Sequence, residues 1–404
     1  MRILVLNSGS SSQKSCLYQL AAPLPADPPP PLWEARLEWG GEEEAAELRV
    51  RNQHGASRRE RLPHRSRAAA LERLLGCLSE GSAAAVGSPA EIDAVGHRIV
   101  HGGREFREAT RVTPEVIRTI AKLSEIAPLH NRAEVGGIRS IERLFGPIPQ
   151  VAVFDTAFHR TLAPEAAAYA GPHAWLKDGI ERYGFHGINH RYCAERAARL
   201  LRREPASLRL ISCHLGNGCS LAAISGGRSV DTTMGFTPLD GLVMGSRSGS
   251  VDPGILIHLV RTRGLGADDL DRVLNRESGL LGLSGVSSDM RQVLAAKEAG
   301  NPRAGLAFDV FVHRLRGLLG AMLASLGGLD VVVFTAGIGE NVPEIRAAAC
   351  APFGFLGLQL DSGKNDANLV ETDLAAQDST VRVLVIPAQE DWAIACECWR
   401  LLGK

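Results

Sequence analysis

A polar segment near the start of the chain has the residue types that a polyphosphate site needs. Between Asn7 and Lys14 lie four serines, one glycine and one glutamine. Apolar residues fill positions 3–6, and positions 17–20 alternate between apolar and polar, so the segment is predicted to be the turn of a β-hairpin. Small residues let backbone N–H groups and hydroxyls approach phosphate oxygens closely, and Lys14 adds a positive charge. An ordinary polar turn fits the same residues.

The segment is not a Walker P-loop. That motif needs a glycine directly before its lysine and a helix directly after it. Here Gln13 precedes Lys14, and the pattern that follows has a period of two residues. A phosphate bound here is therefore expected to lie in a strand–turn–strand hairpin.

A second hairpin of the same kind begins at the apolar run 208–213. Its turn is His214-Leu215-Gly216-Asn217-Gly218, and positions 221–225 read as the returning strand. The two hairpins lie about 200 residues apart in a chain of 404 residues. A repeat at half the chain length predicts two duplicated lobes, each giving one phosphate loop to a shared cleft. Paired hairpins of this kind resemble the superfamily of actin, sugar kinases and heat-shock ATPases.

Two arginines lie in glycine-rich surroundings that suit anion binding. Arg98 comes late in a predicted strand over 92–100, and Arg247 lies in the small-residue loop 245–249. Guanidinium groups bind carboxylate or phosphate with two parallel hydrogen bonds. Surface ion pairing is the alternative for both arginines.

Other polar residues follow directly after predicted strands. Asp155 ends the strand pattern 148–154, and the glycine-rich tract 335–341 follows the apolar run 331–334. Ligands of α/β sheets bind at the carboxyl ends of strands, and a glycine-rich turn before a helix at 342–344 would suit a nucleotide.

The elements that position these residues alternate between strands and helices. Helices are predicted to begin at Thr113-Pro114, Asn189, Asp252-Pro253 and Asn301-Pro302, and a last helix spans about 390–402. The helix after Asn301 carries an apolar stripe that starts at Leu306. Together with strands at 331–334 and 381–386, this pattern predicts an α/β protein. The segment 21–68, rich in proline and then in arginine, is the least regular part, and its arginines are expected on a solvated face or loop.

Composition limits the classes of function. Lys plus Arg and Asp plus Glu both total 45, so the formal charge is zero, which argues against nucleic acid or a membrane surface as the main partner. No apolar run reaches the ~18 residues of a membrane span, and no signal peptide is recognisable. The eight cysteines are scattered through apolar segments, so we expect reduced, mostly buried thiols in a cytoplasmic protein.

Several long motifs, in order along the chain, closely resemble the acetate kinase family. The resemblance covers residues 1–20 and 91–395. It rests on Asn7-Ser8-Gly9-Ser10-Ser11-Ser12, Gly96-His97-Arg98-Ile99-Val100-His101-Gly102-Gly103, Ala127-Pro128-Leu129-His130-Asn131, Val153-Phe154-Asp155-Thr156-Ala157-Phe158-His159, Arg182-Tyr183-Gly184-Phe185-His186-Gly187, His214-Leu215-Gly216-Asn217-Gly218, the run 231–249 and the run 334–341.

The resemblance implies a fold and a set of partners. The fold would be a duplicated, two-lobed actin-like ATPase fold with ribonuclease H-like lobes and an interlobe cleft. The N-terminal lobe would span 1–155, with the helix 392–404 packing back on it, and the C-terminal lobe would span 156–391. Partners would be acetate and ATP, or acetyl phosphate and ADP, with Mg²⁺ as the cofactor and Mn²⁺ as a substitute, in a homodimer.

The resemblance also implies roles for individual residues. Catalysis would fall to Arg98, Asp155, His186 and Arg247, and the metal would be held by Asn7 and Glu390. Arg98 would bind the substrate carboxylate, and the acyl tail would contact Val100, Leu129, Phe185 and Pro238. The nucleotide would be bound by Lys14, His214, Leu215, Gly216, Asn217, Gly218, Asp289, Met290, Arg291, Gly337, Ile338, Gly339, Glu340 and Asn341.

The chain departs from the family pattern at several loop positions. Ile188-Asn189 replace the usual Thr-Ser, Arg132 replaces a proline, Ser250 stands where an acid is common, and Asp391-Trp392 follow Glu390 in place of Glu-Leu. None of these changes removes a residue with an implied catalytic role.

The expected activity is reversible, Mg²⁺-dependent, direct in-line phosphoryl transfer from ATP to acetate, giving acetyl phosphate and ADP. A carboxylate is already ionised at neutral pH, so the acceptor needs no general base. The alternatives are a kinase for propionate or another short-chain carboxylate, and a non-catalytic nucleotide-binding protein of the same fold.

Overall fold

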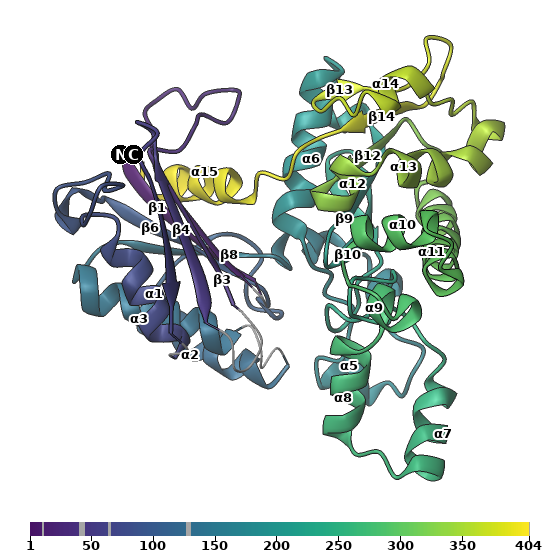
Figure 1. The fold of residues 1–404 in the computed structure, drawn as a ribbon, viewed down its shortest axis with the longest axis horizontal. Helices are drawn as coiled ribbons and strands as arrows, with labels where there is room; N and C mark the ends of the chain where they lie inside the picture. Colours follow the sequence, from purple (N-terminus) through teal and green to yellow (C-terminus); the bar gives the residue numbers. More distant parts are fainter. Residues whose placement is uncertain (10–11, 40–44, 64–65, 127–130, 404) are drawn as a thin grey trace. The chain divides into compact units, whose positions relative to one another are not determined.

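The computed structural model describes residues 1–9, 12–39, 45–63, 66–126 and 131–403. The chain divides into two compact units (Figure 1). The first unit consists of Met1–Ala157 and Gln389–Lys404, and the second consists of Phe158–Ala388. Glu390 and Asp391 therefore lie in the first unit, whereas the sequence-based division at 391 placed them in the second, because they form the first turn of the C-terminal helix.

The first unit is built on a mixed sheet. In the described part of the unit the strand order is β5-β4-β3-β2-β1-β6-β8-β7. The strands are β1 (Arg2–Ser8), β2 (Ser12–Gln19), β3 (Trp33–Glu38), β4 (Ala46–Asn52), β5 (Ser57–Leu62), β6 (Ala94–Ile99), β7 (Thr110–Arg111) and β8 (Gln150–Phe154). Its longer helices are α1 (Arg67–Gly76), α2 (Pro114–Lys122), α3 (Asn131–Phe145) and α15 (Glu390–Leu402).

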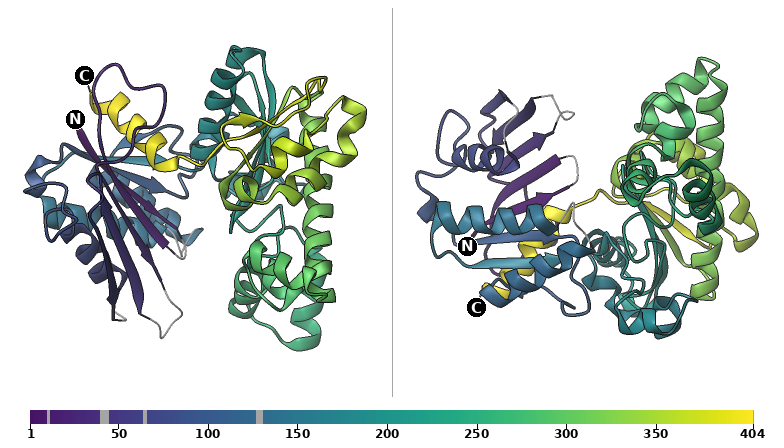
Figure 2. Two further views of the ribbon diagram at one scale, coloured as in Figure 1. Left: turned by 45° about the horizontal axis from the view of Figure 1, so that its top comes forward. Right: turned by 90° about the horizontal axis from the view of Figure 1, so that it is seen from below.

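Helices cover opposite faces of this sheet. Leu4, Leu17 and Val95 point to one face and pack in a core with Leu71 and Leu74 of α1. Residues of opposite parity point to the other face, where Tyr18 meets Trp392 of α15 with ring centroids 5.7 Å apart. Figure 1 and Figure 2 show α15 (yellow) alongside the sheet. The two ends of the chain sequence thus meet in one unit.

A glycine on β6 allows α15 to approach the sheet closely. A Cβ at Gly96 would lie 2.6 Å from Sγ of Cys398 and 2.7 Å from Cγ2 of Ile394. Any larger residue at position 96 would push this helix, and Glu390 at its start, away from the strands.

The second unit contains a sheet with the order β11-β10-β9-β12-β14-β13 among the described strands. They are β9 (Arg209–Leu215), β10 (Cys219–Ser225), β11 (Arg228–Thr232), β12 (Val331–Thr335), β13 (Thr372–Asp373) and β14 (Arg382–Val385). The helices are α4 (Pro164–Ala167), α5 (Ala174–Lys177), α6 (Gly187–Leu200), α7 (Pro253–Arg263), α8 (Ala267–Arg276), α9 (Gly279–Ser284), α10 (Met290–Glu298), α11 (Pro302–Leu326), α12 (Ala336–Asn341), α13 (Pro343–Cys350) and α14 (Ser362–Asp366).

The two sheets share one topology, which confirms the predicted duplication. In the first unit the order β3-β2-β1-β6-β8-β7 contains an antiparallel three-strand meander, two parallel strands and an antiparallel edge strand. The order β11-β10-β9-β12-β14-β13 repeats these relations one by one in the second unit. The hairpins at Asn7 and His214 are equivalent corners of the repeated sheet.

Most predicted elements are confirmed, and four predictions need correction. The segment 21–68 is more regular than expected, because it contains β3, β4 and β5. Asn189 lies inside α6, whose first helical residue is Gly187. The tract 336–341 is itself the short helix α12, so the glycine-rich turn is absent there. Leu306, the predicted start of the apolar stripe of α11, is 54% exposed, because the buried face begins at Ala304 and Ala307; Phe311 and Leu315 of the predicted stripe are buried as expected.

All eight cysteines are buried and free, as the sequence predicted. Among the described residues, no helix combines the length and the apolar character that crossing a bilayer requires.

Candidate functional site

Arg98 and Asp155 meet at the carboxyl ends of two neighbouring parallel strands. Arg98 lies near the end of β6, and Asp155 follows β8, where its N–H donates to Ile99 O at 2.9 Å. Both Nη2 (2.5 Å) and Nε (3.1 Å) of Arg98 donate to Oδ2 of Asp155. The Asp155 side chain is only 1% exposed and that of Arg98 is 12% exposed. The pair therefore forms a shielded charged site at the edge of the sheet.

Asn7 links this pair to α15. Its Oδ1 accepts a hydrogen bond from Nη1 of Arg98 at 3.2 Å. Its Nδ2 donates to Oε2 of Glu390 at 3.0 Å and to Oδ1 of Asp391 at 2.9 Å. These contacts fix the orientation of the amide, because only the NH₂ group can donate to carboxylates. Residues more than 380 positions apart in sequence are thus direct neighbours.

Lys14 stands beside Asn7 and is held by the same helix. The two residues are directly paired across β1 and β2. Nζ of Lys14 lies 2.5 Å from Oδ2 of Asp391, whose side chain is 4% exposed. Burial lowers the pKa of Lys14, but attraction and hydrogen bonding to Asp391, together with Cys16 and Glu34, raise it to a net value above the ordinary one. Lys14 is therefore charged at neutral pH, as a phosphate contact must be.

The residues just described around Asn7 form one site, called the first-unit site below, and it contains more acidic than basic side chains. Asp155, Glu390 and Asp391 surround the cations Arg98 and Lys14. Burial lowers the pKa of Arg98, but Asp155 and Glu390 raise it to a net value above the ordinary one. The guanidinium thus stays charged and able to bind an anion.

The second unit gathers His186, His214 and Arg247 around the turn of its hairpin. The rings of His186 and His214 are stacked, with centroids 4.0 Å apart and planes 15° apart. A Cβ at Gly218 would lie 3.3 Å from Cε1 of His186 and 3.4 Å from Nη1 of Arg247. Any larger residue at position 218 would therefore make the His186 or Arg247 side chain shift by a few tenths of an ångström.

His186 has a strained backbone and a fixed ring. Its φ of 55° is in the left-handed region, which is uncommon for residues other than glycine and often marks functional sites. Its Nδ1 is hydrogen-bonded to Oγ of Ser220 at 2.9 Å, and the same hydroxyl is hydrogen-bonded to Nε2 of His190 at 2.8 Å. Burial lowers the pKa of His190 well below its ordinary value, so His190 stays neutral.

The residues expected around an acyl tail are divided between the units. Val100, 4% exposed, belongs to the first unit. Phe185 is 1% exposed in the second, where Pro238 O accepts from Nη1 of Arg247 at 3.0 Å. Leu129 lies outside the described residues.

Besides Lys14 and the turn 214–218, the residues expected around the nucleotide lie at the start of α10 and on α12. Asp289 caps α10 through a 2.9 Å bond from Arg291 N, and Met290 is buried. Gly337, Ile338, Gly339, Glu340 and Asn341 form α12, directly after β12. The buried Arg346, which the sequence analysis missed, donates from Nη1 to Gly339 O and Glu340 O, both at 2.9 Å. It thereby satisfies carbonyl groups at the end of a very short helix.

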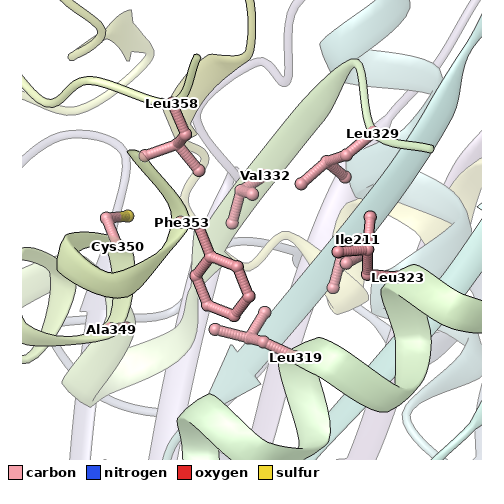
Figure 3. A pocket seen from close by; sticks show the side chains of 9 residues that line it. All are labelled: Ile211, Leu319, Leu323, Leu329, Val332, Ala349, Cys350, Phe353 and Leu358. Carbon is pink, nitrogen blue, oxygen red and sulfur yellow. The ribbon is translucent and has the colours of Figure 1, made fainter. Parts of the chain in front are cut away.

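Two cavities of the second unit lie away from these residues. One is lined by apolar side chains between α11, α13 and the sheet, including Ile211, Leu319 and Phe353 (Figure 3). Its volume of about 10 Å³ holds at most one water molecule. A second cavity of about 270 Å³ lies between α13 and α14 and contacts Ala347 and Asn365. Neither cavity is lined by a predicted site residue.

The chain matches the acetokinase family over residues 2–396. The chain belongs to this family. It is 58% identical to an acetate kinase of Trichormus variabilis over 405 residues, covering all of both chains. Among solved structures, it resembles an acetate kinase of Porphyromonas gingivalis with a TM-score of 0.90, 39% identity and 99% coverage of each chain. A propionate kinase of Francisella tularensis has a TM-score of 0.88, 36% identity and 98% coverage of each chain.

Membership of the acetokinase family makes the chain a kinase and confirms the resemblance drawn from the motifs. The acetokinase fold brings together Asn7, Lys14, Arg98, Asp155 and Glu390 in one unit and His186, His214, Gly218 and Arg247 in the other.

The sequence analysis also missed the contacts of two further polar residues of this acetokinase. Asp391 was noted only as a departure from the family pattern, yet it contacts both Asn7 and Lys14. Asn189 was expected to cap a helix, but its Nδ2 donates to Nδ1 of His214 at 2.9 Å. The acidic pair Glu390-Asp391 at a predicted helix start was the available signal for the first, and no local signal marked the second.

Proposed function

We propose that this acetokinase transfers the γ-phosphoryl group of ATP directly to acetate, giving acetyl phosphate and ADP, and that it also catalyses the reverse reaction. The observation that supports this proposal best is the Arg98 site, in which a guanidinium that is only 12% exposed is fixed by Asp155 and Asn7 at the carboxyl ends of the strands. A carboxylate substrate can accept hydrogen bonds from such a guanidinium without needing a base.

Each charged residue has a proposed task in the transfer. The transition state of phosphoryl transfer spreads negative charge over oxygens, so catalysis depends on positioning and on cations. Arg98 would hold the acceptor carboxylate, and Lys14 would contact a phosphate of ATP. His186 and Arg247 would stabilise the transferring group, while Asp155 would orient a metal or water rather than accept a proton.

The oxygen-rich end of the first-unit site fits Mg²⁺. Among the described residues, no group of three or more His, Cys, Asp or Glu side chains can hold a metal by itself. Mg²⁺ usually needs only one or two carboxylates, with the remaining ligands from water and substrate phosphates. Glu390 would supply a hard carboxylate oxygen beside an excess of acids. The Asn7 amide would have to turn to offer its oxygen to the ion, because its Oδ1 accepts from Arg98 and its Nδ2 donates to Glu390. The ion would neutralise charge on the phosphate oxygens.

The nucleotide is proposed to lie on the second unit. The turn 214–218 would bind phosphates, and residues 289–291 and 337–341 would contact adenosine and the α- and β-phosphates. Glycines at 216 and 218 suit this task because neither has a side chain that would obstruct a phosphate, although the Gly216 N–H itself donates to Gly218 O at 3.0 Å.

Trapping of acyl phosphate tests the proposed reaction. The protein is incubated with ATP, Mg²⁺, hydroxylamine and, in separate reactions, acetate, propionate or butyrate, and the hydroxamate product is measured. Acetate is expected to be preferred, with propionate second and butyrate poor. A preference for propionate would favour the alternative of a propionate kinase, and no hydroxamate with any acid would favour a non-catalytic nucleotide-binding protein.

Direct in-line transfer predicts a stereochemical result. The acceptor is itself a good oxyanion nucleophile, so a phosphorylated Asp155 or Glu390 would bring little gain. A chiral γ-phosphate is expected to be transferred with inversion of configuration. Retention would instead indicate a two-step relay through the enzyme.

Val100→Ala is expected to shift preference toward longer acids. Removing methyl groups enlarges the proposed acyl pocket, and one buried CH₂ is worth about 0.8 kcal/mol, close to fourfold in kcat/KM. The ratio of kcat/KM for propionate to that for acetate should therefore rise by about that factor. Val116→Ala on α2 is the matched control, and an unchanged ratio in both variants would remove Val100 from the pocket.

The family resemblance also leads us to propose that the protein forms a homodimer and is located in the cytoplasm. A homodimer would cover α7, where Ile255, Ile257 and Val260 are each 46–52% exposed. Light scattering should then give twice the chain mass, and Ile257→Asp should reduce it to one chain. The eight free thiols suit a cytoplasmic protein, which cell fractionation can test.

A further inference from the structure

The chain leaves strand β6 through a segment that side chains of α3 hold in place. Val100 and His101 follow the last residue of β6, just past Arg98. Asn131, in the first turn of α3, accepts from His101 N at 3.3 Å and donates to His101 O at 3.1 Å. The Asn131 side chain of α3 therefore helps to hold this backbone segment, in addition to the contacts between strands.

Glu134 holds the adjacent peptide. It lies three residues after Asn131, so both side chains project from one face of α3. Each of its carboxyl oxygens lies 3.2 Å from Val100 N, and the residue is only 3% exposed. A carboxyl group in this position sets where the Val100 peptide lies, and with it the start of the proposed acyl pocket.

Glu134 also lies within electrostatic reach of the carboxylate-binding arginine. The charges that act on it are Arg98 on β6 and Asp155 after β8, and His101 is the neighbouring imidazole along the chain. Arg98 is already paired with Asp155 and lies 3.9 Å from Glu390. An additional negative charge at Glu134 would compete with a substrate carboxylate for the same guanidinium.

We propose that Glu134 is a positioning residue, which fixes the Val100 peptide beside Arg98, and that the charge on its carboxylate weakens binding of the carboxylate substrate. This inference rests on the proposed function, because it takes Arg98 as the group that binds the acceptor acid. The carboxyl group need not touch the substrate, since it acts through Arg98 and Val100.

The protonation of Glu134 can change in the neutral range. Burial raises the pKa of Glu134 to about 8, with Asp155 adding to the rise and the Val100 N–H and Arg98 opposing it. Below that pH the carboxyl group is neutral and still accepts the Val100 hydrogen bond through its carbonyl oxygen. Above it the group is negative and repels the acceptor carboxylate. The KM for acetate should therefore rise with pH, while acetate itself stays ionised throughout.

The size of the effect follows from Coulomb's law. Two unit charges at a separation on the order of 10 Å and an effective dielectric constant of about 20 change an equilibrium by roughly tenfold. The KM for acetate of the unsubstituted protein is thus expected to rise by roughly tenfold between pH 6.5 and pH 9.5. The KM for Mg²⁺-bound ATP should change less.

Glu134→Gln separates charge from position. The amide keeps an oxygen acceptor for Val100 N–H but carries no charge at any pH. This variant is expected to retain kcat and to show a KM for acetate that stays low across the pH range. Glu134→Ala removes the acceptor and is expected to lower kcat/KM at every pH. Glu142→Gln, which removes an exposed acid from the same helix, is the matched control and should keep the parent profile.

The outcomes distinguish this inference from the proposed function. If the parent protein forms no acyl phosphate, the proposed function fails. If it forms acyl phosphate, and the profile of KM against pH is the same in the parent and in Glu134→Gln, the role of the Glu134 charge is wrong. If Glu134→Ala matches Glu134→Gln at every pH, the positioning role is wrong. Circular dichroism of each variant shows whether the fold is retained.

Discussion

Arg98→Ala is expected to reduce turnover by about 10²–10³-fold, the loss typical of removing one preorganised charged contact from a transition state. The same substitution should also destabilise the protein. Asp155 is 1% exposed and would lose its cation, and leaving a buried charge unpaired costs about 3–5 kcal/mol in the free energy of unfolding. Steady-state kinetics and thermal unfolding together measure the two effects. Arg247→Ala is expected to lose turnover by a similar factor.

A double variant separates chemistry from stability. Arg98→Ala combined with Asp155→Asn removes the unpaired charge, so the unfolding temperature should recover. Turnover should stay low, because this variant lacks both Arg98 and the Asp155 carboxylate, and low turnover in a stable protein is then not caused by unfolding. Arg118→Ala, which removes an exposed arginine paired with Glu115 on α2, is the control and should change neither quantity. Near-normal turnover in folded Arg98→Ala would contradict the assignment of Arg98 to the acceptor carboxylate.

Much of the fold could be predicted because its elements carry local signals. Pro at the first helical position and a capping side chain before it marked α2, α7 and α11 correctly. Strands β3 and β4 also carried a signal, since every second residue of Trp33–Glu38 and Ala46–Asn52 is buried and the residues between are partly or fully exposed. That signal was missed because prolines and charge runs flank it. Period-two alternation is the better guide there, because charged residues are tolerated on the open face of a sheet.

The site was predictable where a motif carried it and not where distant parts of the chain meet. The hairpin turn and Arg98 were recognised from their neighbours in sequence. The pairing of Asn7 with Glu390 came only from the family resemblance. No local pattern indicates that residues 383 positions apart meet, because the contact depends on α15 packing against β1. Glu134 gave no signal at all, because an acid on an amphipathic helix normally faces water. Its burial becomes apparent only when β6 and α3 are placed side by side.

Asp391→Ala is expected to weaken the proposed ATP site more than the acetate site. Oδ2 of Asp391 accepts from Lys14 at 2.5 Å and lies 3.7 Å from Sγ of Cys16, while Oδ1 accepts from Asn7 at 2.9 Å. Hydrogen bonds to a charged group are each worth about 1.5–3 kcal/mol, so losing them should lower kcat/KM for ATP by about 10–100-fold. Lys14 is 46% exposed and would then sample many orientations.

The contrast among three variants identifies the cause. Asp391→Asn keeps an acceptor for Asn7 but loses the charge that attracts Lys14, so it should raise the KM for ATP while leaving the KM for acetate nearly unchanged. Cys16→Ala removes only a thiol, a weak donor whose pKa is raised by burial and by Asp391, and should change either KM by less than about threefold. If Asp391→Asn lowers kcat/KM for ATP and for acetate by the same factor, Asp391 supports the whole site through Asn7 and does not act on Lys14 in particular. In that case the proposed contact between Lys14 and the ATP phosphates would lose its main structural argument. That argument is that the buried Asp391 carboxylate is there to hold the Lys14 ammonium group in place.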